Sequence, residues 1–234
     1  MIRGGLLLDA RHRAFAAADI LVADGRIAEL GPPGLPVPEN AKLVNATGKL
    51  IHPGLINAHT HGHGSLSKGM GDRWTLELLL TSSVFTYAGR TLEDRTLSTK
   101  LAAAEMAMKG CTACYDLNLE LPAPTHEGTI AVAQAYADVG IRAVIAPAVA
   151  DRSFFQAMPG LLEALPLELR SQVLNARFAE PQTALATLKT ILVHWPFDND
   201  KIRLALAPTI PMHCSDDFLT GCSKLADEFG LWCP

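Results

Sequence analysis

Apolar and polar positions along the chain follow two different patterns, which change near residue 54. In the first part, short apolar runs alternate with turn residues, and Asp24-Gly25 stands between two such runs in "DILVADGRIAEL". Asp-Gly in that place is typical of a β-hairpin. "GPPGLPVPEN" predicts a proline-rich loop, and "KLVNATGKLIHPG" adds two more short strands. We therefore expect a small β layer over residues 1–53.

From residue 54 onward, the pattern of a strand followed by a helix repeats. Four apolar runs predict strands: "LINAH", "CTACYDL", "IRAVIAPAV" and "IRLALAPTI". Helices are expected over 91–109, 127–140 and 215–230, with helical pieces broken by prolines over 153–194. Near-continuous apolar strands that alternate with helices predict an α/β fold with a parallel sheet. Because a (β/α)8 TIM-type barrel needs eight such units, residues 54–234 predict its first four strand–helix units, which is half a barrel.

Composition excludes several classes of function. The 20 basic and 24 acidic residues give a net charge of -4, which predicts no strong attraction to nucleic acid or to anionic membranes. No uncharged run reaches the roughly 18 apolar residues of a membrane span, and the first residues are too short an apolar stretch for a secretory signal. The five cysteines are scattered, so we expect a reduced, cytoplasmic protein.

The first of these strands ends in "LINAHTHGHG", which places histidines at every second position. His59 and His61 would project from one face of the strand, at the end where parallel barrels place their chemistry. Two neutral imidazoles side by side suit a divalent ion such as zinc. His61 and His63 form a second alternating pair, but Gly62 indicates the end of the strand and favours the first pair. The alternative is that these are histidines of a surface loop, or that one of them is a core histidine with a satisfied partner.

The segment "GKLIHPGLINAHTH" resembles the signature of the amidohydrolase superfamily, which comprises metal-dependent hydrolases on a distorted (β/α)8 barrel. "ADILVADGRIAELGP" resembles the amino-terminal part of the small β-sandwich that accompanies this barrel. "GCTACYDL", "GIRAVIAPAV" and "LALAPTIPMHCSDD" resemble barrel strands two to four of one branch. That branch holds the cytosine, guanine and S-adenosylhomocysteine deaminases and the triazine hydrolases. The resemblance covers essentially the whole chain.

The resemblance implies a hydrolase that acts on a carbon–nitrogen bond outside peptides, most simply by deaminating a nitrogen heterocycle. Zinc, or alternatively iron, held by His59, His61 and further ligands would lower the pKa of a bound water towards about 7. The activated water would attack an electron-poor ring or amide carbon, and an acidic residue would pass a proton to the leaving amine. The partner is thus a small-molecule substrate, and full-length relatives are expected to form homo-oligomers.

The chain also departs from the family pattern. A third metal-binding histidine should end strand five, a histidine strand six and an aspartate strand eight, but the sequence stops after "KLADEFGLWCP". The catalytic acid and base therefore cannot be assigned to any residue here. We expect a fragment of a longer enzyme that is inactive alone. The alternative is a non-catalytic half-barrel that acts as an interaction module or needs a partner chain.

Three further residues are candidates for substrate contacts: His63 and Trp74 in the loop after the first strand, and His213 after the fourth. The competing interpretation is helix packing for Trp74 and, for His213, a histidine of the capping region next to Ser215. Cys111 and Cys114 have the CxxC spacing of redox or metal sites, but they open an apolar strand rather than a helix. Buried structural thiols are the expected reading, and a redox protein is the weakest of the three functional hypotheses.

Overall fold

The computed structural model describes residues 1–87, 89–175 and 178–231 and divides into two compact units, Met1–Gly54 and Leu55–Pro234. The first unit is a five-stranded sheet, in the order β3-β2-β1-β4, with β5 also paired to β1. Its strands are β1 (Ile2–Asp9), β2 (Ala14–Ala23), β3 (Arg26–Gly31), β4 (Val44–Asn45) and β5 (Leu50–Ile51). The predicted hairpin is confirmed, since Asp24 and Gly25 join β2 to β3 with φ values of 49° and 72°.

A buried carboxylate organises this small sheet. Asp19 is 1% exposed and accepts hydrogen bonds from the backbone N–H groups of Gly4, Gly34 and Leu35 at 2.8, 2.8 and 3.2 Å. These bonds lower the pKa of the Asp19 carboxyl, the one from Gly34 most, and the carboxylate in turn ties the proline-rich loop to β1. The unit is therefore held by one polar centre in addition to its few buried apolar residues.

The second unit is built on a parallel sheet, as the sequence predicted. Its strands are β6 (Leu55–Thr60), β7 (Cys111–Leu119), β8 (Arg142–Val149), β9 (Ile202–Leu204) and β10 (Ala207–Pro208). The order is β10-β8-β7-β6, with β9 also paired to β8. β9 and β10 keep one register along β8, because Ile202 lies opposite Ala143 and Ala207 opposite Ala148. They thus form the expected fourth strand, interrupted over residues 205–206.

Eight α-helices occur in the described part of this unit. They are α1 (Leu76–Tyr87), α2 (Leu92–Met108), α3 (His126–Val139), α4 (Phe154–Ala157), α5 (Leu161–Ala164), α6 (Leu167–Asn175), α7 (Pro181–Val193) and α8 (Asp216–Phe229), and two 3₁₀ turns, η1 (Gly62–Ser67) and η2 (Pro211–His213), follow β6 and β10. Thr91 and Asp94 form a reciprocal cap at the start of α2, and Ser215 caps α8. The predicted helix boundaries are therefore confirmed to within a residue or two.

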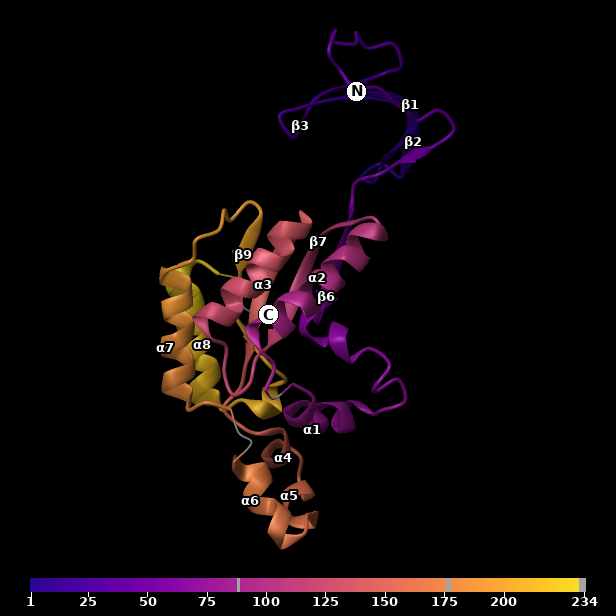
Figure 1. Cartoon of the computed structure of the whole chain (residues 1–234). Coiled ribbons are helices and arrows are strands. Elements are labelled where there is room, and N and C mark those ends of the chain that lie inside the picture. The colour runs from indigo at the N-terminus through magenta and orange to yellow at the C-terminus, as the bar shows by residue number, and fades with distance from the viewer. Residues whose placement is uncertain (88, 176–177, 232–234) are drawn as a thin grey trace. The chain divides into compact units, whose positions relative to one another are not determined.

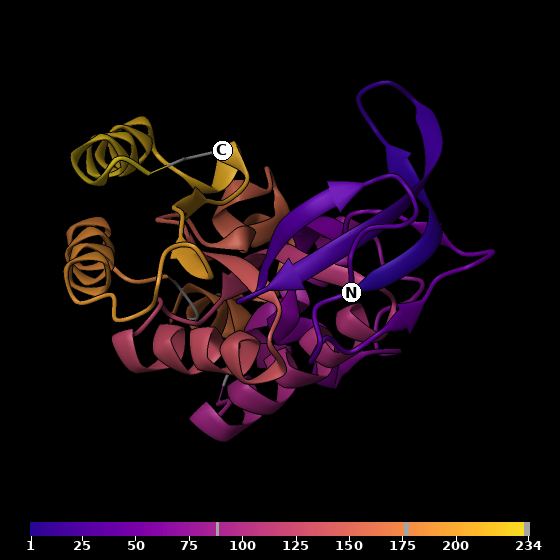
Figure 2. The same ribbon diagram turned by 90° about the horizontal axis from the view of Figure 1, so that it is seen from above.

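The long helices cover one face of the sheet. In Figure 2, α2, α3, α7 and α8 follow one another in an arc beside the strands. Buried side chains fill the space between these helices and the sheet, among them Tyr136, Ile145, Leu188 and Phe218, each at most 1% exposed. On the opposite face, small alanines pack beneath the partly exposed Tyr115, Leu117 and Val144. The candidate site lies on this face, at the carboxyl ends of β6, β7 and β10.

Helix α1 was not predicted. Its segment "LELLLTSSVFTY" is apolar on every side, so it has no 3.6-residue pattern that would mark a helix. Residues on opposite sides of it, such as Leu76 and Phe85, are 57% and 73% exposed. Among the described residues, no helix combines the length and the apolar character needed to cross a membrane.

Candidate active site

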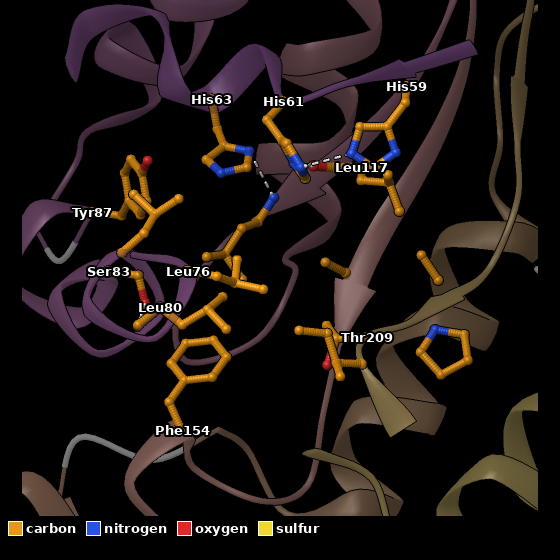
Figure 3. A pocket seen from close by; sticks show the side chains of 16 residues that line it. His59, His61, His63, Leu76, Leu80, Ser83, Tyr87, Leu117, Phe154 and Thr209 are labelled. Carbon is orange, nitrogen blue, oxygen red and sulfur yellow. Dashed lines mark hydrogen bonds between the residues drawn. The ribbon is translucent and has the colours of Figure 1, made fainter. Parts of the chain in front are cut away.

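Three histidines lie in a row where β6 ends (Figure 3). β6 carries one extra residue relative to β7, because Asn57 lies opposite Cys114 and Thr60 opposite Asp116. Such a bulge re-aims the side chains that follow it. The ring of His61 is 4.9 Å from the ring of His59 and 5.4 Å from that of His63, centroid to centroid. The structure therefore brings all three histidines together, rather than one alternating pair.

The first pair is arranged nitrogen to nitrogen. His59 Nε2 and His61 Nε2 are 3.1 Å apart, and both rings are exposed. His61 Nδ1 lies 2.9 Å from the carbonyl oxygen of Leu117 on β7, which can only accept. His61 therefore carries its proton on Nδ1 when neutral, and its Nε2 lone pair faces His59. A metal-binding histidine commonly donates its other ring N–H to a backbone carbonyl, which fixes the orientation of the ring.

His63 is held differently. It is 8% exposed, and its Nδ1 accepts a hydrogen bond from the backbone N–H of Leu119 at 3.1 Å. Burial lowers the pKa of His63 to about 3, with smaller contributions from the nearby charges of His61, Arg90 and Arg95. The ring is thus neutral at physiological pH and carries its proton on Nε2. It packs edge to face on Tyr87, with a centroid distance of 4.9 Å.

The histidines line a cavity of about 470 Å³. One wall comes from α1, through Leu76, Leu79, Leu80, Ser83 and Tyr87, and the opposite side includes Thr209 after β10 (Figure 3). None of the described residues that line it is an acid, a lysine or an arginine. The α1 wall was missed at the sequence level, since its uncharged run carries no motif. The cavity therefore combines three imidazole rings with a lining that is otherwise mostly apolar and uncharged.

The structure does not bring the other two candidates to the lining of this cavity. Trp74 is 36% exposed, and its ring would meet a Cβ added at Gly71, so it packs on its own loop. His213 is fully buried, with its ring 4.6 Å from that of Phe154. Neither ring nitrogen of His213 has a hydrogen-bond partner among the described residues.

The buried His213 should make the protein sensitive to acid. Burial lowers the pKa of His213, so below about pH 6.5 the unfolded chain binds a proton that the native ring does not. Stability is therefore lost as the pH falls. Replacing His213 with leucine removes this loss and an unpaired polar group, so we expect a gain of about 1–3 kcal/mol in the free energy of unfolding, larger at pH 5.5 than at pH 7.5.

Urea unfolding at the two pH values measures this effect. His194→Leu is the matched control, because His194 is exposed and donates from Nδ1 to the carbonyl oxygen of Thr190. The expectation fails if His213→Leu is less stable than the wild type at both pH values, or if the two variants respond to pH alike.

The CxxC pair shows no sign of redox chemistry. Cys114 is 3% exposed, and burial raises its pKa to about 12, so its thiol stays protonated. Reactive cysteines need the opposite shift, towards the thiolate. Within the described ranges, Cys111, Cys114, Cys214 and Cys222 form no disulfide. Cys233 lies outside the described residues.

The described residues hold no group of three or more His, Cys, Asp and Glu side chains that converge on one point. Of the side chains that could bind a metal, His59 and His61 are the pair whose nitrogens approach each other. A catalytic zinc site usually has three protein ligands and an open position. The pair can thus supply part of such a site.

Comparison with known protein families decides the relationship. The family model described as the amidohydrolase family matches residues 50–233 of this chain, which include the histidine row and all the strands of the second unit. The chain belongs to the amidohydrolase family. Its fold class is accordingly the α/β barrel class that the sequence predicted.

Curated amidohydrolases with similar sequences are deaminases. The chain is 29% identical over 236 residues to a 5-methylthioadenosine/S-adenosylhomocysteine deaminase of Symbiobacterium thermophilum, which aligns with 99% of this chain and 47% of the relative. It is 26% identical to an 8-oxoguanine deaminase of Pseudomonas aeruginosa, over 96% of this chain and 48% of the relative. The chain thus spans about half the length of these curated relatives.

Solved structures show the same relation. The crystal structure of atrazine chlorohydrolase from Arthrobacter aurescens complexed with zinc matches 99% of this chain and 51% of its own, with a TM-score of 0.79 and 19% identity. At that identity the likeness establishes the fold. This chain therefore corresponds to about half of that solved chain.

Proposed function

We propose that this amidohydrolase chain carries part of a metal-dependent active site that hydrolyses a carbon–nitrogen bond outside peptides, with deamination of a nitrogen heterocycle as the reaction. The observation that carries the proposal is the His59–His61 pair at the end of β6, with the His61 ring fixed by the Leu117 carbonyl. The deaminase relatives support this reaction class.

The pair fits a divalent cation. In a tetrahedral zinc site with Zn–N bonds of about 2.0–2.1 Å, two ligand nitrogens are about 3.3 Å apart. The observed separation of 3.1 Å between the two Nε2 atoms is close to that value. The separation of two facing nitrogens does not distinguish zinc from iron, so the proposal covers both. Zinc is the first choice because the solved atrazine chlorohydrolase was crystallised with zinc.

The residues around the pair have separate roles in this proposal. A bound divalent ion would lower the pKa of a water from 15.7 towards about 7. His61 is ready to bind through Nε2, whereas His59 would have to carry its proton on Nδ1 rather than Nε2, which its exposure to water permits. His63, neutral and protonated on Nε2, would donate a hydrogen bond to an acceptor of the substrate.

The cavity indicates the class of substrate. Its described lining has no acidic, lysine or arginine side chain, and α1 contributes mainly leucines. A small, uncharged heterocycle would fit this wall, since burying a charged group without a partner is costly. We propose such a heterocycle as the substrate.

The chain by itself should not turn over substrate, because the described residues supply two converging ligands and the described cavity lining holds no acidic residue to shuttle a proton. We expect no ammonia release above background when the 234-residue chain is incubated with zinc and a panel of aminopurines, aminotriazines and cytosine. The full coding region should then be read beyond the last codon, in all three frames. A downstream His-x-Ala-Glu strand and a late aspartate would complete the site, and the longer product would be assayed.

Two results contradict the proposal. Zinc-dependent turnover by the 234-residue chain would contradict the expectation that this chain is inactive by itself. A coding region that adds no further metal ligands and no acidic residue would contradict the enzymatic reading itself.

A second candidate function has one observation in its favour. β6 lies at an edge of the described sheet, and its Leu55 and Ile56 are 50% and 73% exposed. Exposed apolar edge strands favour pairing with another chain. In this reading the half-barrel is a non-catalytic module that needs a partner. Light scattering after gel filtration tests it: a monomer at micromolar concentration would argue against self-pairing.

A further inference from the structure

The turn that follows β6 is tied down by side chains from two other elements. The N–H of Gly62 donates to Asp116 Oδ1 of β7 at 2.9 Å. Ser98 Oγ of α2 lies 2.9 Å from the carbonyl oxygens of both Gly62 and His63, and its single proton is shared between them. The N–H of Gly64 donates to the carbonyl oxygen of His61 at 2.8 Å. The turn therefore has few free backbone groups, and two buried side chains, Asp116 and Ser98, make three of these contacts with its backbone.

Asp116 is unusual among the residues of its strand. It is a fully buried carboxyl group, placed opposite Thr60 in the β6–β7 ladder. Tyr136 of α3, also fully buried, donates its hydroxyl to Asp116 Oδ2 at 3.0 Å. Burial raises the pKa of Asp116, opposed by the hydrogen bonds from Gly62 and Tyr136. A buried carboxyl group is costly and needs partners, and both strong partners here hold the histidine turn against α3.

Gly62 and Asp116 fit each other closely. A Cβ added at Gly62 would lie 2.8 Å from Asp116 Oδ2 and 2.8 Å from Tyr136 Oη. Glycine therefore lets the carboxylate reach the backbone of the turn. The same strand also holds the ring of the preceding histidine, because Leu117 follows Asp116 and its carbonyl oxygen accepts from His61 Nδ1. β7 thus grips His61 at two points, through the ring and through the adjacent peptide.

We propose that Asp116 is a positioning residue of the histidine site: through Gly62, with Tyr136 and Ser98 beside it, its carboxylate fixes the direction in which His61 presents Nε2 to a metal ion. This inference rests on the proposed function. Asp116 would not touch the ion itself, and its effect passes through the turn.

Calorimetric titration of the 234-residue chain with ZnCl₂ tests the role. Asp116→Ala removes the acceptor for Gly62 N–H, so zinc affinity should fall by roughly 10–100-fold, as for other groups behind metal ligands. Asp116→Asn keeps an acceptor for Gly62 and a polar partner for Tyr136, and its affinity should stay within about 3-fold of the wild type. Ser98→Ala is a milder change and should weaken zinc binding by about 10-fold. It tests the same turn if Asp116→Ala does not fold.

Glu120→Ala is the matched control. Glu120 is another buried carboxylate just after β7, but it accepts from Thr125, at the start of α3, and pairs with Arg95 of α2, and among the described residues it has no hydrogen bond to a histidine. A loss of zinc affinity in Glu120→Ala equal to that in Asp116→Ala would mean general destabilisation and would overturn the inference. Unchanged affinity in Asp116→Ala, with wild-type circular dichroism, would overturn it as well.

A metal-free measurement separates this inference from the proposed function. Imidazole ¹⁵N shifts report which nitrogen of His61 carries the proton. We expect the Nδ1–H form in the wild type, Asp116→Asn and Glu120→Ala, and a mixture of both forms in Asp116→Ala. If the wild type binds no zinc, the metal site fails while these shifts still decide the role of Asp116. An unchanged Nδ1–H form in Asp116→Ala would refute that role.

Discussion

Replacing His61 with alanine is expected to reduce the zinc affinity of the chain by more than the roughly 10–100-fold that loss of a supporting partner costs. His61 is the imidazole whose free nitrogen is set in advance, because the Leu117 carbonyl holds the proton on Nδ1. Without it, His59 is left as an exposed single ligand, and one imidazole does not retain zinc in water. Calorimetric titration with ZnCl₂ measures the change.

His194→Ala provides the control for His61→Ala, since it removes an exposed histidine at the end of α7, away from the cavity. Zinc affinity in this variant should match that of the wild type. If His61→Ala and His194→Ala bind zinc equally well, the zinc is bound elsewhere, and the assignment of the pair is wrong.

Replacing Gly62 with alanine should have the second large effect. The new methyl group would lie 2.8 Å from both Asp116 Oδ2 and Tyr136 Oη, two atoms that are bonded to each other at 3.0 Å and fully buried. Neither can retreat into solvent, so the turn must shift. We expect a loss of about 1–3 kcal/mol in the free energy of unfolding. Because the shift starts next to His61, zinc affinity should fall too.

Gly64→Ala is a control within the same turn. A Cβ there would meet only Tyr87 Oη, at an ordinary 3.7 Å, so stability should stay within about 0.5 kcal/mol of the wild type. Urea unfolding curves compare the two variants. The close fit around Gly62 is refuted if Gly62→Ala and Gly64→Ala have the same free energy of unfolding.

Elements with strong local signals could be predicted from the sequence. Asp24-Gly25 marked the hairpin, and the helices expected over 91–109 and 127–140 correspond to α2 and α3, so the structure confirms each one. These signals work because turns and caps depend on neighbouring residues. α1 was missed for the converse reason: its apolar residues face both the cavity and solvent, which leaves no periodicity to detect.

The candidate site was predictable in part. The spacing of His59, His61 and His63 drew attention to them, and the structure brings them together around one cavity. Their supports could not be deduced in the same way, since Leu117 and Asp116 lie more than 50 residues along the chain from the turn they hold. Asp116, an acidic residue inside the apolar run "CTACYDL", is the one signal in the sequence that indicates a buried polar contact there. Its partner, Gly62, becomes evident only when the two strands are seen side by side.

The histidines and the α1 wall of the cavity belong to separate elements, and this separation has an evolutionary consequence. The histidine row depends on the β6–β7 ladder and its buried hydrogen bonds, whereas Leu76, Leu79 and Leu80 enter the cavity from a helix with two exposed sides. Mutations at these three leucines can therefore accumulate without disturbing the imidazoles, whereas Tyr87 at the end of α1 packs on His63. If the site acts on a heterocycle as proposed, descendants of this chain could come to accept new ring substituents through changes at these leucines while the histidines stay unchanged.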